Sequence, residues 1–174
     1  GYFSSYNGTA TGNFVGLNSD GSIDSGFVTG SGFGPSGENS LRRLARQPDG
    51  KILASGSFAT YDGNPSQHLV RLTATGAYDG TFALGTGLVY DPEDIAVLPD
   101  GDVVVVGYNI QSFAGTPRKG LARFNSNGTL DPAQVLRWGT PGGQVNVILP
   151  APGGKWLVAG AFESVAGVAT RNIV

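Results

Sequence analysis

The hydrophobic pattern of the chain consists of short strand-like runs that recur about every 50 residues. Residues 48–58 begin with a Pro-Asp-Gly turn, continue as an apolar run and end on Gly-x-Phe. The turn and the apolar run return over residues 99–108, which end on Gly-Tyr, and the whole series returns over residues 152–162, where the turn reads Pro-Gly-Gly. The intervals between equivalent turn residues are 51 and 53 residues. A period of this length predicts tandem β-units.

Within each unit the same parts follow one another. After Gly-x-Phe comes a loop that closes on Gly, then a short alternating strand, a turn of the Asp-Gly or Asn-Gly kind, and a return strand that carries Asp. An apolar strand then leads into the next Pro-x-Gly turn. The predicted short strands are residues 13–17, 68–72 and 120–124, and the apolar strands are residues 41–47, 92–98 and 145–151. No stretch has the 3.6-residue period of a helix.

These parts predict an all-β, β-propeller-like array of four-stranded blades with a repeat of about 50 residues. If Gly-x-Phe marks the start of each unit, residues 1–174 form a single array of units 1–55, 56–106 and 107–159 with a partial unit 160–174. A stacked β-solenoid is the alternative, although its coils are usually shorter. About three blades cannot close a propeller ring. We therefore expect either a piece of a longer array or a ring that other chains complete.

Two motifs occur in the same order in successive units, and they resemble those of the delta-60 repeat family. The first is Leu17-Asn18-Ser19-Asp20-Gly21-Ser22-Ile23-Asp24-Ser25-Gly26-Phe27, and the second is Gln47-Pro48-Asp49-Gly50-Lys51-Ile52-Leu53. The resemblance implies tandem repeats that form β-propellers in large secreted or surface-exposed bacterial proteins. It weakens in the third unit, where the Phe after Asp131 is missing. The family implies an extracellular or cell-surface location and supplies no catalytic residues.

Composition narrows the classes of partner. Charged residues make up 14% of the chain and the net charge is −2, so there is no basic field for nucleic acid or an anionic membrane. The longest aliphatic run is Val103–Val106, which predicts no membrane insertion. With no Cys and one His, a thiol nucleophile or zinc site is not expected, and we predict no cofactor. Residues 18–24 resemble the start of a calcium loop, but the twelfth position holds Thr29, so no metal site is predicted.

Structural roles account for several recurring or bulky residues. Arg71 and Asp79, and likewise Arg123 and Asp131, should face each other across a hairpin. Asp24 has Gly16 opposite it and is expected to cap backbone amides of its own turn. Trp156 takes the place of Ile52 in the core strand and should be buried.

Candidate binding residues are those that differ between units, because recurring residues build the fold. Arg42 and Arg43 stand where the next unit has Glu93 and Asp94, on the strand expected to be innermost in each blade. They predict either ion pairs between blades or a site for a polar ligand or another subunit. Trp138 lies in a Gly/Pro-rich segment, where it either packs or serves as an anchor for a sugar or protein.

Three functional hypotheses follow. The first is a noncatalytic propeller module of a bacterial surface or secreted protein, used for display, adhesion or protein interaction, with a protein or glycan as ligand. The second is a propeller-fold carbohydrate-active hydrolase or lyase, for which the cluster Asp91, Glu93 and Asp94 would have to supply paired carboxylates. The third is a structural subunit of an extracellular assembly, in which further copies or the rest of its own chain complete the ring. Of these we expect the first, and no enzyme.

Overall fold

The fold is built almost wholly from short antiparallel strands. The structure, a computed structural model, describes residues 3–34, 40–85, 87–107, 110, 112–113, 116–118, 120–133, 144–165 and 168–169. The one helical element among them is a single 3₁₀ turn, η1 (Pro152–Gly154). Those residues contain no helix of the length and apolarity that a membrane crossing requires. The all-β prediction is therefore confirmed.

The strands form repeated sheets, which we number as blades. Blade 1 comprises residues 3–28, and blades 2, 3 and 4 each begin with an inner strand followed by a middle strand. Blade 2 holds β4 (Ser40–Arg46), β5 (Ile52–Ser57) and β8 (Leu69–Leu72), in the order β4-β5-β8. Blade 3 holds β9 (Asp94–Val97), β10 (Val103–Val106) and β13 (Leu121–Phe124) in the equivalent order. Blade 4 holds β14 (Gln144–Ala151) and β15 (Lys155–Ala161).

The fourth strand predicted for each blade is much shorter than expected. The return segment contacts the third strand through one isolated bridge, Leu72 to Tyr78 in blade 2 and Phe124 to Leu130 in blade 3. The predicted strand at residues 13–17 is likewise reduced to the bridge from Leu17 to Ile23. In blades 2 and 3 the third strand pairs with the middle strand. In the described part of blade 1, residues 13–17 hold the third-strand position but no middle strand pairs with them.

The loops that close on Gly are small β-hairpins. Asn7-Gly8 and Asp62-Gly63 have positive φ at both positions, as a two-residue hairpin turn of type I′ requires. The strands concerned are β1 (Ser5–Tyr6) with β2 (Thr9–Ala10), β6 (Thr60–Tyr61) with β7 (Asn64–Pro65), β11 (Ser112–Phe113) with β12 (Thr116–Pro117), and β16 (Ser164–Val165) with β17 (Val168–Ala169). A further strand, β3 (Phe33–Gly34), pairs with β6 and ties blade 1 to blade 2.

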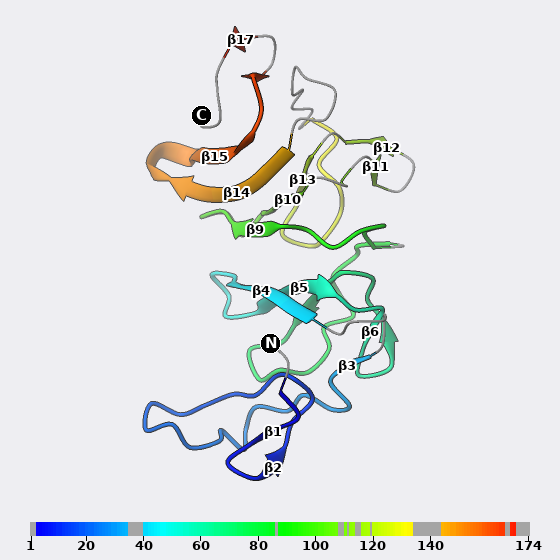
Figure 1. Ribbon diagram of the computed structural model, residues 1–174, viewed down its shortest axis with the longest axis vertical. Coiled ribbons are helices and arrows are strands. Elements are labelled where there is room, and N and C mark those ends of the chain that lie inside the picture. The colour runs from blue at the N-terminus through cyan, green and yellow to red at the C-terminus, as the bar shows by residue number, and fades with distance from the viewer. Residues whose placement is uncertain are drawn as a thin grey trace.

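The blades follow one another in a row, with blade 1 at one end and β14–β15 towards the other (Figure 1). The inner strands are neighbours: β4 contacts β9, and β9 contacts β14. Each sheet takes its inner strand from one sequence unit and its third strand from the next, because β5 spans the boundary between units 1–55 and 56–106. Period and blade thus agree in length but not in starting point.

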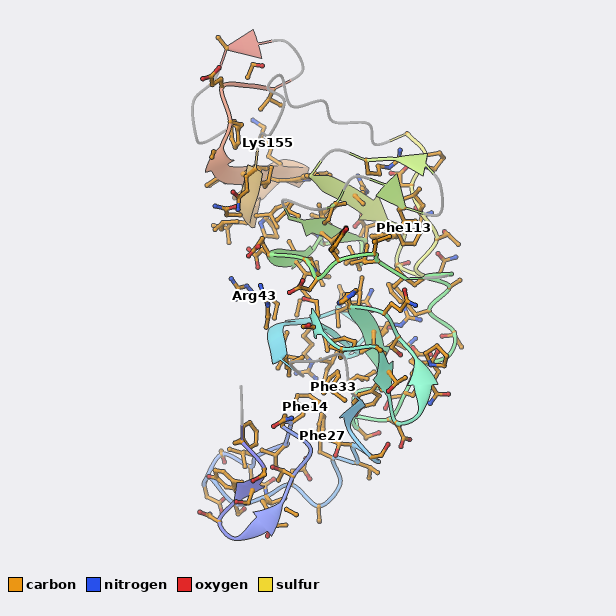
Figure 2. The ribbon with its side chains drawn as sticks, turned by 45° about the vertical axis from the view of Figure 1, so that its right-hand side comes forward. Phe14, Phe27, Phe33, Arg43, Phe113 and Lys155 are labelled. Carbon is orange, nitrogen blue, oxygen red and sulfur yellow. The ribbon has the colours of Figure 1, made fainter. Side chains whose placement is uncertain are left out.

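Hydrophobic side chains of the middle strands fill the seams between blades. Alternate residues point to opposite faces of a strand, so Val103 and Val105 join the cluster shared with blade 2 while Val104 and Val106 join the cluster shared with blade 4. All four are fully buried, which explains their uninterrupted apolar run. The seam between blades 1 and 2 is aromatic, and Phe33 lies at its centre in contact with Phe14, Phe58 and Tyr61 (Figure 2 labels Phe14 and Phe33).

Trp156 differs from expectation. It is half-buried rather than buried, and it packs against the cluster between blades 3 and 4. The position lies at the turn end of the middle strand, where Ile52 of blade 2 is also half-buried. The equivalent residue of blade 3, Val103, is fully buried.

Candidate functional site

The recurring Asp shapes the turn that ends each third-strand hairpin. The carboxylate Oδ1 of Asp24 accepts a hydrogen bond from the Gly26 amide at 2.8 Å. Asp79 does the same for Thr81 at 3.0 Å, and Asp131 for Ala133 at 2.8 Å. The capping role expected for Asp24 is thus confirmed and is shared by all three residues.

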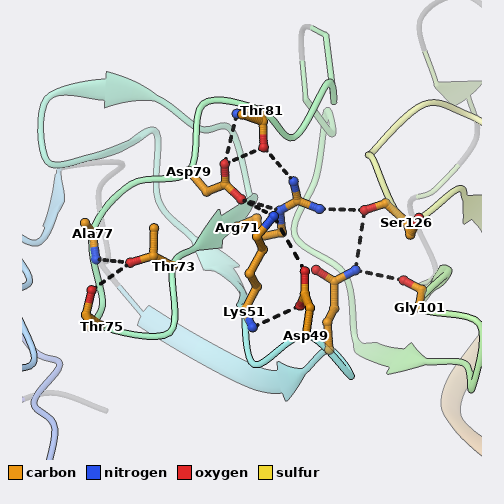
Figure 3. A network of polar contacts seen from close by, with 11 residues as sticks. Asp49, Lys51, Arg71, Thr73, Thr75, Ala77, Asp79, Thr81, Gly101 and Ser126 are labelled. Atoms are coloured by element: carbon orange, nitrogen blue, oxygen red, sulfur yellow. Dashed lines mark hydrogen bonds and ion pairs between the residues drawn. The ribbon is translucent and has the colours of Figure 1, made fainter.

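Arg71 carries the main polar network between blades 2 and 3 (Figure 3). Its guanidinium is buried and donates from Nε to Asp79 Oδ2 at 2.8 Å, from Nη2 to Thr81 Oγ1 at 2.9 Å and from Nη1 to the Ser126 carbonyl of blade 3 at 2.5 Å. It also lies 4.7 Å from the centre of the Phe82 ring. The predicted pairing of Arg71 with Asp79 is confirmed.

The charge of Asp79 is stabilised by its partners. Burial alone would raise the pKa of this carboxyl, but hydrogen bonds from Thr81, the positive charge of Arg71 and the contact with Lys51 outweigh burial and lower the pKa to about 2. The network is therefore charged at neutral pH and fully paired, which assigns it to the fold rather than to binding.

In blade 3 the equivalent arginine turns to other partners. Arg123 donates to Asp102 Oδ2 from Nε at 3.0 Å and from Nη2 at 2.8 Å, and to Asp100 at 3.1 Å. The expected partner Asp131 lies farther away, 3.7 Å from Nε. Asp102 replaces Lys51 of blade 2, and this change from cation to anion explains the difference.

An aromatic residue joins blade 1 to blade 2, and another joins blade 2 to blade 3. Phe27 of blade 1 lies against Gly76 of blade 2, and Phe82 of blade 2 lies against Gly128 of blade 3. A Cβ at Gly76 or Gly128 would come within 2.9 Å or 2.8 Å of the ring concerned. Beside each ring a backbone amide donates across the seam: Val28 to Thr75 at 2.7 Å and Ala83 to Asn127 at 2.7 Å. We call this pair of contacts the aromatic staple.

Four of the candidate binding residues come together on the inner strands, between β4 and β9. Arg42 Nη2 lies 2.9 Å from Asp91 Oδ2, and its Nη1 lies 3.9 Å from Glu93 Oε2. Arg43 Nε donates to Asp94 Oδ1 at 3.0 Å (Figure 2 labels Arg43). These are ion pairs between blades 2 and 3. The fifth candidate, Trp138, lies outside the described residues.

Asp94 links three blades. While Oδ1 accepts from Arg43 of blade 2, Oδ2 accepts from the Ile148 backbone amide of blade 4 at 3.1 Å. The Asp94 side chain is 15% exposed, whereas that of Arg43 is 48% exposed, so the bond to the Ile148 amide is the better shielded of the two. Replacement of the carboxylate would therefore disturb two seams at once.

A β-bulge directs the variable residues outward. The pairing of β4 with β5 shifts between Leu41 and Arg43, and that of β14 with β15 shifts between Val145 and Val147. The extra residues, Arg42 and Asn146, are both exposed. The glycine opposite the second bulge is obligatory, because a Cβ at Gly160 would overlap the Gln144 carbonyl.

Sequence reasoning missed two residues beside this cluster. Val89 and Tyr90 immediately precede Asp91, and they are 65% and 50% exposed. They belong to no predicted strand and have no counterpart in the period. The sequence signal of Tyr90 was its aromatic ring in an irregular segment, a combination that Trp138 shares. Together with Arg42, Arg43, Asp91 and Glu93 they form a surface that we call the inner patch.

Other candidate chemistry is weak in the described part of the chain. No group of three or more His, Asp or Glu side chains there is placed to hold a metal ion. A cavity of about 490 Å³ lies between the Pro-Asp-Gly turns of blades 2 and 3, lined by Lys51, Asp100 and the buried Arg71 among others. The polar groups of Arg71 are already engaged in the seam.

Comparison with known proteins identifies the repeat. The model of one family, described as "Domain of unknown function (DUF5122) beta-propeller", matches residues 1–27, 47–82 and 98–133, more than half of the chain. The search of curated proteins and that of solved structures gave no match. The matched segments contain the capping Asp residues, two Pro-Asp-Gly turns and the ring and glycine of both aromatic staples. The chain belongs to the DUF5122 β-propeller family.

Proposed function

We propose that this chain is a noncatalytic repeat module of a secreted or surface-exposed bacterial protein and that it binds a protein partner through the inner patch. Membership of a β-propeller family supports the repeat module. The resemblance of its two motifs to delta-60 repeats supports the location. A propeller fold alone does not select a function, so the proposal depends on the chemistry of the patch.

The observation that carries the proposal is the contrast between constant seams and a variable inner face. Asp caps recur in blades 1, 2 and 3, Pro-Asp-Gly turns recur in blades 2 and 3, and aromatic staples recur at the two seams between these blades. At the bulge position of the inner strands, by contrast, Arg42, Glu93 and Asn146 differ in charge. Repeat proteins that recognise partners vary surface residues on a fixed frame in this way.

The inner patch has the residue types that dominate protein interfaces. Tyr and Arg are enriched among residues that contribute most to binding, and here Tyr90 and Arg42 lie close to Asp91 and are about half exposed. Both signs of charge surround them, which favours a protein partner of mixed charge over a polyanion.

The acids of the patch support a noncatalytic role. Asp91, Glu93 and Asp94 each have an oxygen within 3.9 Å of an arginine nitrogen. A glycosidase needs one carboxyl group to deliver a proton and another facing the substrate. Here each carboxylate has a cation of the neighbouring blade as its immediate partner.

Binding assays with matched variants test the proposal. The chain is screened against protein and glycan arrays, and any ligand is then titrated against Tyr90→Ala, Arg42→Ala and the control Val28→Ala, which removes a 58% exposed side chain away from the patch. We expect a protein ligand whose affinity falls at least tenfold with either patch variant and stays unchanged with the control.

Other outcomes would replace the proposal. A glycan ligand whose binding is lost with Trp138→Ala would favour adhesion through a sugar. Polysaccharide cleavage that is lost with Glu93→Gln would favour the enzyme.

A further inference from the structure

The charged groups between β4 and β9 are not all satisfied to the same degree. Asp94 is fully engaged, because its Oδ1 accepts from Arg43 and its Oδ2 accepts from the Ile148 amide. Arg42 and Asp91 also satisfy each other, with 2.9 Å between Nη2 and Oδ2, and the Asp91 side chain is 24% exposed. These groups serve the seams between blades and have little capacity left for a ligand.

Two charged groups of the inner patch keep free hydrogen-bonding capacity. The Glu93 carboxylate accepts no hydrogen bond within the described part of the chain, and Arg42 Nη1 lies 3.9 Å from its Oε2; the side chain is 41% exposed. Arg43 donates from Nε to Asp94 and from Nη1 to the Arg42 carbonyl at 3.2 Å, which leaves Nη2 without an acceptor among the described residues. The Arg43 side chain is 48% exposed and projects from the ribbon (Figure 2). One anion and one cation are thus open to a partner.

The apolar part of the patch is held in a fixed position. Val89 and Tyr90 are 65% and 50% exposed, but buried residues flank the segment on both sides. Leu88 is 2% exposed, packs in the cluster between blades 2 and 3, and donates from its amide to the Gln67 carbonyl at 3.2 Å. Pro92 is buried as well. An exposed pair that is anchored on both sides loses less conformational freedom on binding than a mobile loop does.

Opposite charges with this freedom occur at one of the two described contacts between inner strands. Glu93 and Asp94 of blade 3 correspond to Asn146 and Val147 on β14 of blade 4, which are exposed but carry no charge. A partner that needs a positive and a negative group side by side therefore finds them between blades 2 and 3. A polyanion or a polycation would meet a like charge there.

On the basis of the proposed function, we infer that the partner presents a basic side chain to Glu93, a carboxylate to Arg43 and an apolar side chain to the Val89–Tyr90 segment. A carboxylate on the Arg43 guanidinium forms a charge-assisted hydrogen bond, and a Lys or Arg does the same on Glu93. A partner with the two charges exchanged meets like charge at both positions, and this repulsion excludes it. Glu93 and Arg43 therefore determine the specificity of the patch.

Glu93 is the residue to change, because no seam depends on it. Arg42 keeps its closer partner, Asp91, when Glu93 is replaced. Arg43, by contrast, holds a seam through its Nε. Glu93→Lys therefore inverts one charge of the surface that faces the partner. The control is Glu163→Lys, which makes the same change at an exposed position after β15, outside the inner patch.

Selection from a displayed library of random linear peptides supplies the probe. The library is selected on the wild type, with Tyr90→Ala for counter-selection. The peptide that best distinguishes the two proteins is synthesised in three forms: as selected, with its basic residue changed to Glu, and with its acidic residue changed to the corresponding amide. Each form is titrated against wild type, Glu93→Lys and Glu163→Lys by isothermal titration calorimetry.

We expect the selected peptides to combine an apolar, a basic and an acidic residue. With wild type and Glu163→Lys, both altered forms should bind at least about tenfold more weakly than the selected form. With Glu93→Lys, the form that carries Glu in place of the base should bind more tightly than the selected form. This reversal also shows that the variant folds.

Failure of the charge matching can be distinguished from failure of the patch. Peptides that lose binding with Tyr90→Ala but keep the same charge preference on Glu93→Lys would overturn the inference and leave the proposed function standing. The same holds if the change of acid to amide has no effect, or if Glu163→Lys reverses the preference equally. If no peptide distinguishes wild type from Tyr90→Ala, both the inference and the proposed function are wrong.

Discussion

Replacement of Asp79 by Asn tests whether the buried ion pair with Arg71 holds the seam between blades 2 and 3. The substitution keeps the shape of the side chain and an oxygen that can accept from the Thr81 amide, but it removes the charge 2.8 Å from Arg71 Nε. Arg71 is 4% exposed and would lose its only strong anionic partner in the described network. Leaving a buried charge without its partner costs about 3–5 kcal/mol.

The pH dependence gives a second, independent estimate. The pKa of Asp79 is lowered from 3.8 to about 2, and each pKa unit corresponds to about 1.4 kcal/mol, so the carboxylate contributes about 2 kcal/mol at neutral pH. Because the folded-state pKa is the lower one, this stability is present above pH 3.8 and is lost as the pH falls towards 2. Asp79→Asn should lack this part of the acid sensitivity.

Urea unfolding followed by circular dichroism at pH 7 and pH 3 measures both effects. The control is Asp24→Asn, which alters the same kind of capped turn opposite Gly16, where no arginine stands. We expect it to cost less than about 1 kcal/mol. The ion-pair assignment would be refuted if Asp79→Asn and Asp24→Asn lowered the free energy of unfolding equally at pH 7. It would also be refuted if the difference in free energy of unfolding between wild type and Asp79→Asn were the same at pH 3 as at pH 7.

Three further substitutions probe the seams and the turns, with the free energy of urea unfolding as the measurement. Phe82→Ala removes a 9% exposed ring from an aromatic staple and should cost about 3–5 kcal/mol; a cost below 1 kcal/mol would mean that the staple does not hold the blades. Gly76→Ala meets the Phe27 ring at 2.9 Å at a φ of +88°, so it should cost at least about 1 kcal/mol more than Gly63→Ala, which has φ +73° and nothing within 4 Å. His68 has φ +64°, and both His68→Val and His68→Gly lose the contact of its Nδ1 with the Gly56 carbonyl. His68→Val should therefore cost about 1–2 kcal/mol more than His68→Gly, and equal costs would contradict a backbone cause.

Local pattern was sufficient to predict the repeat and its strands. The apolar strands expected at 41–47 and 145–151 are found as Ser40–Arg46 and Gln144–Ala151, each paired with the middle strand of its blade. The pairing of Arg71 with Asp79 also follows from sequence, since hairpin register places the two residues opposite each other.

Contacts that depend on a second blade or a preceding turn could not be predicted in the same way. Arg123 binds Asp100 and Asp102, which lie on another turn of its blade, and hairpin register says nothing of their approach. The bond from the Ile148 amide to Asp94 uses a backbone group that carries no sequence signal. The exposure of Tyr90 likewise depends on how the segment before β9 leaves the blade.

The aromatic staple also bears on how such arrays change in length during evolution. Phe27 and Phe82 each reach forward to a glycine turn one period ahead, and each contact involves residues of adjacent blades only. Duplication or deletion of one whole period in frame would therefore present every remaining ring with an equivalent socket. Gene rearrangement can therefore lengthen or shorten a chain of this kind by whole repeats without new contacts between blades. The number of blades then depends on the number of repeats in the gene and not on the geometry of any one blade.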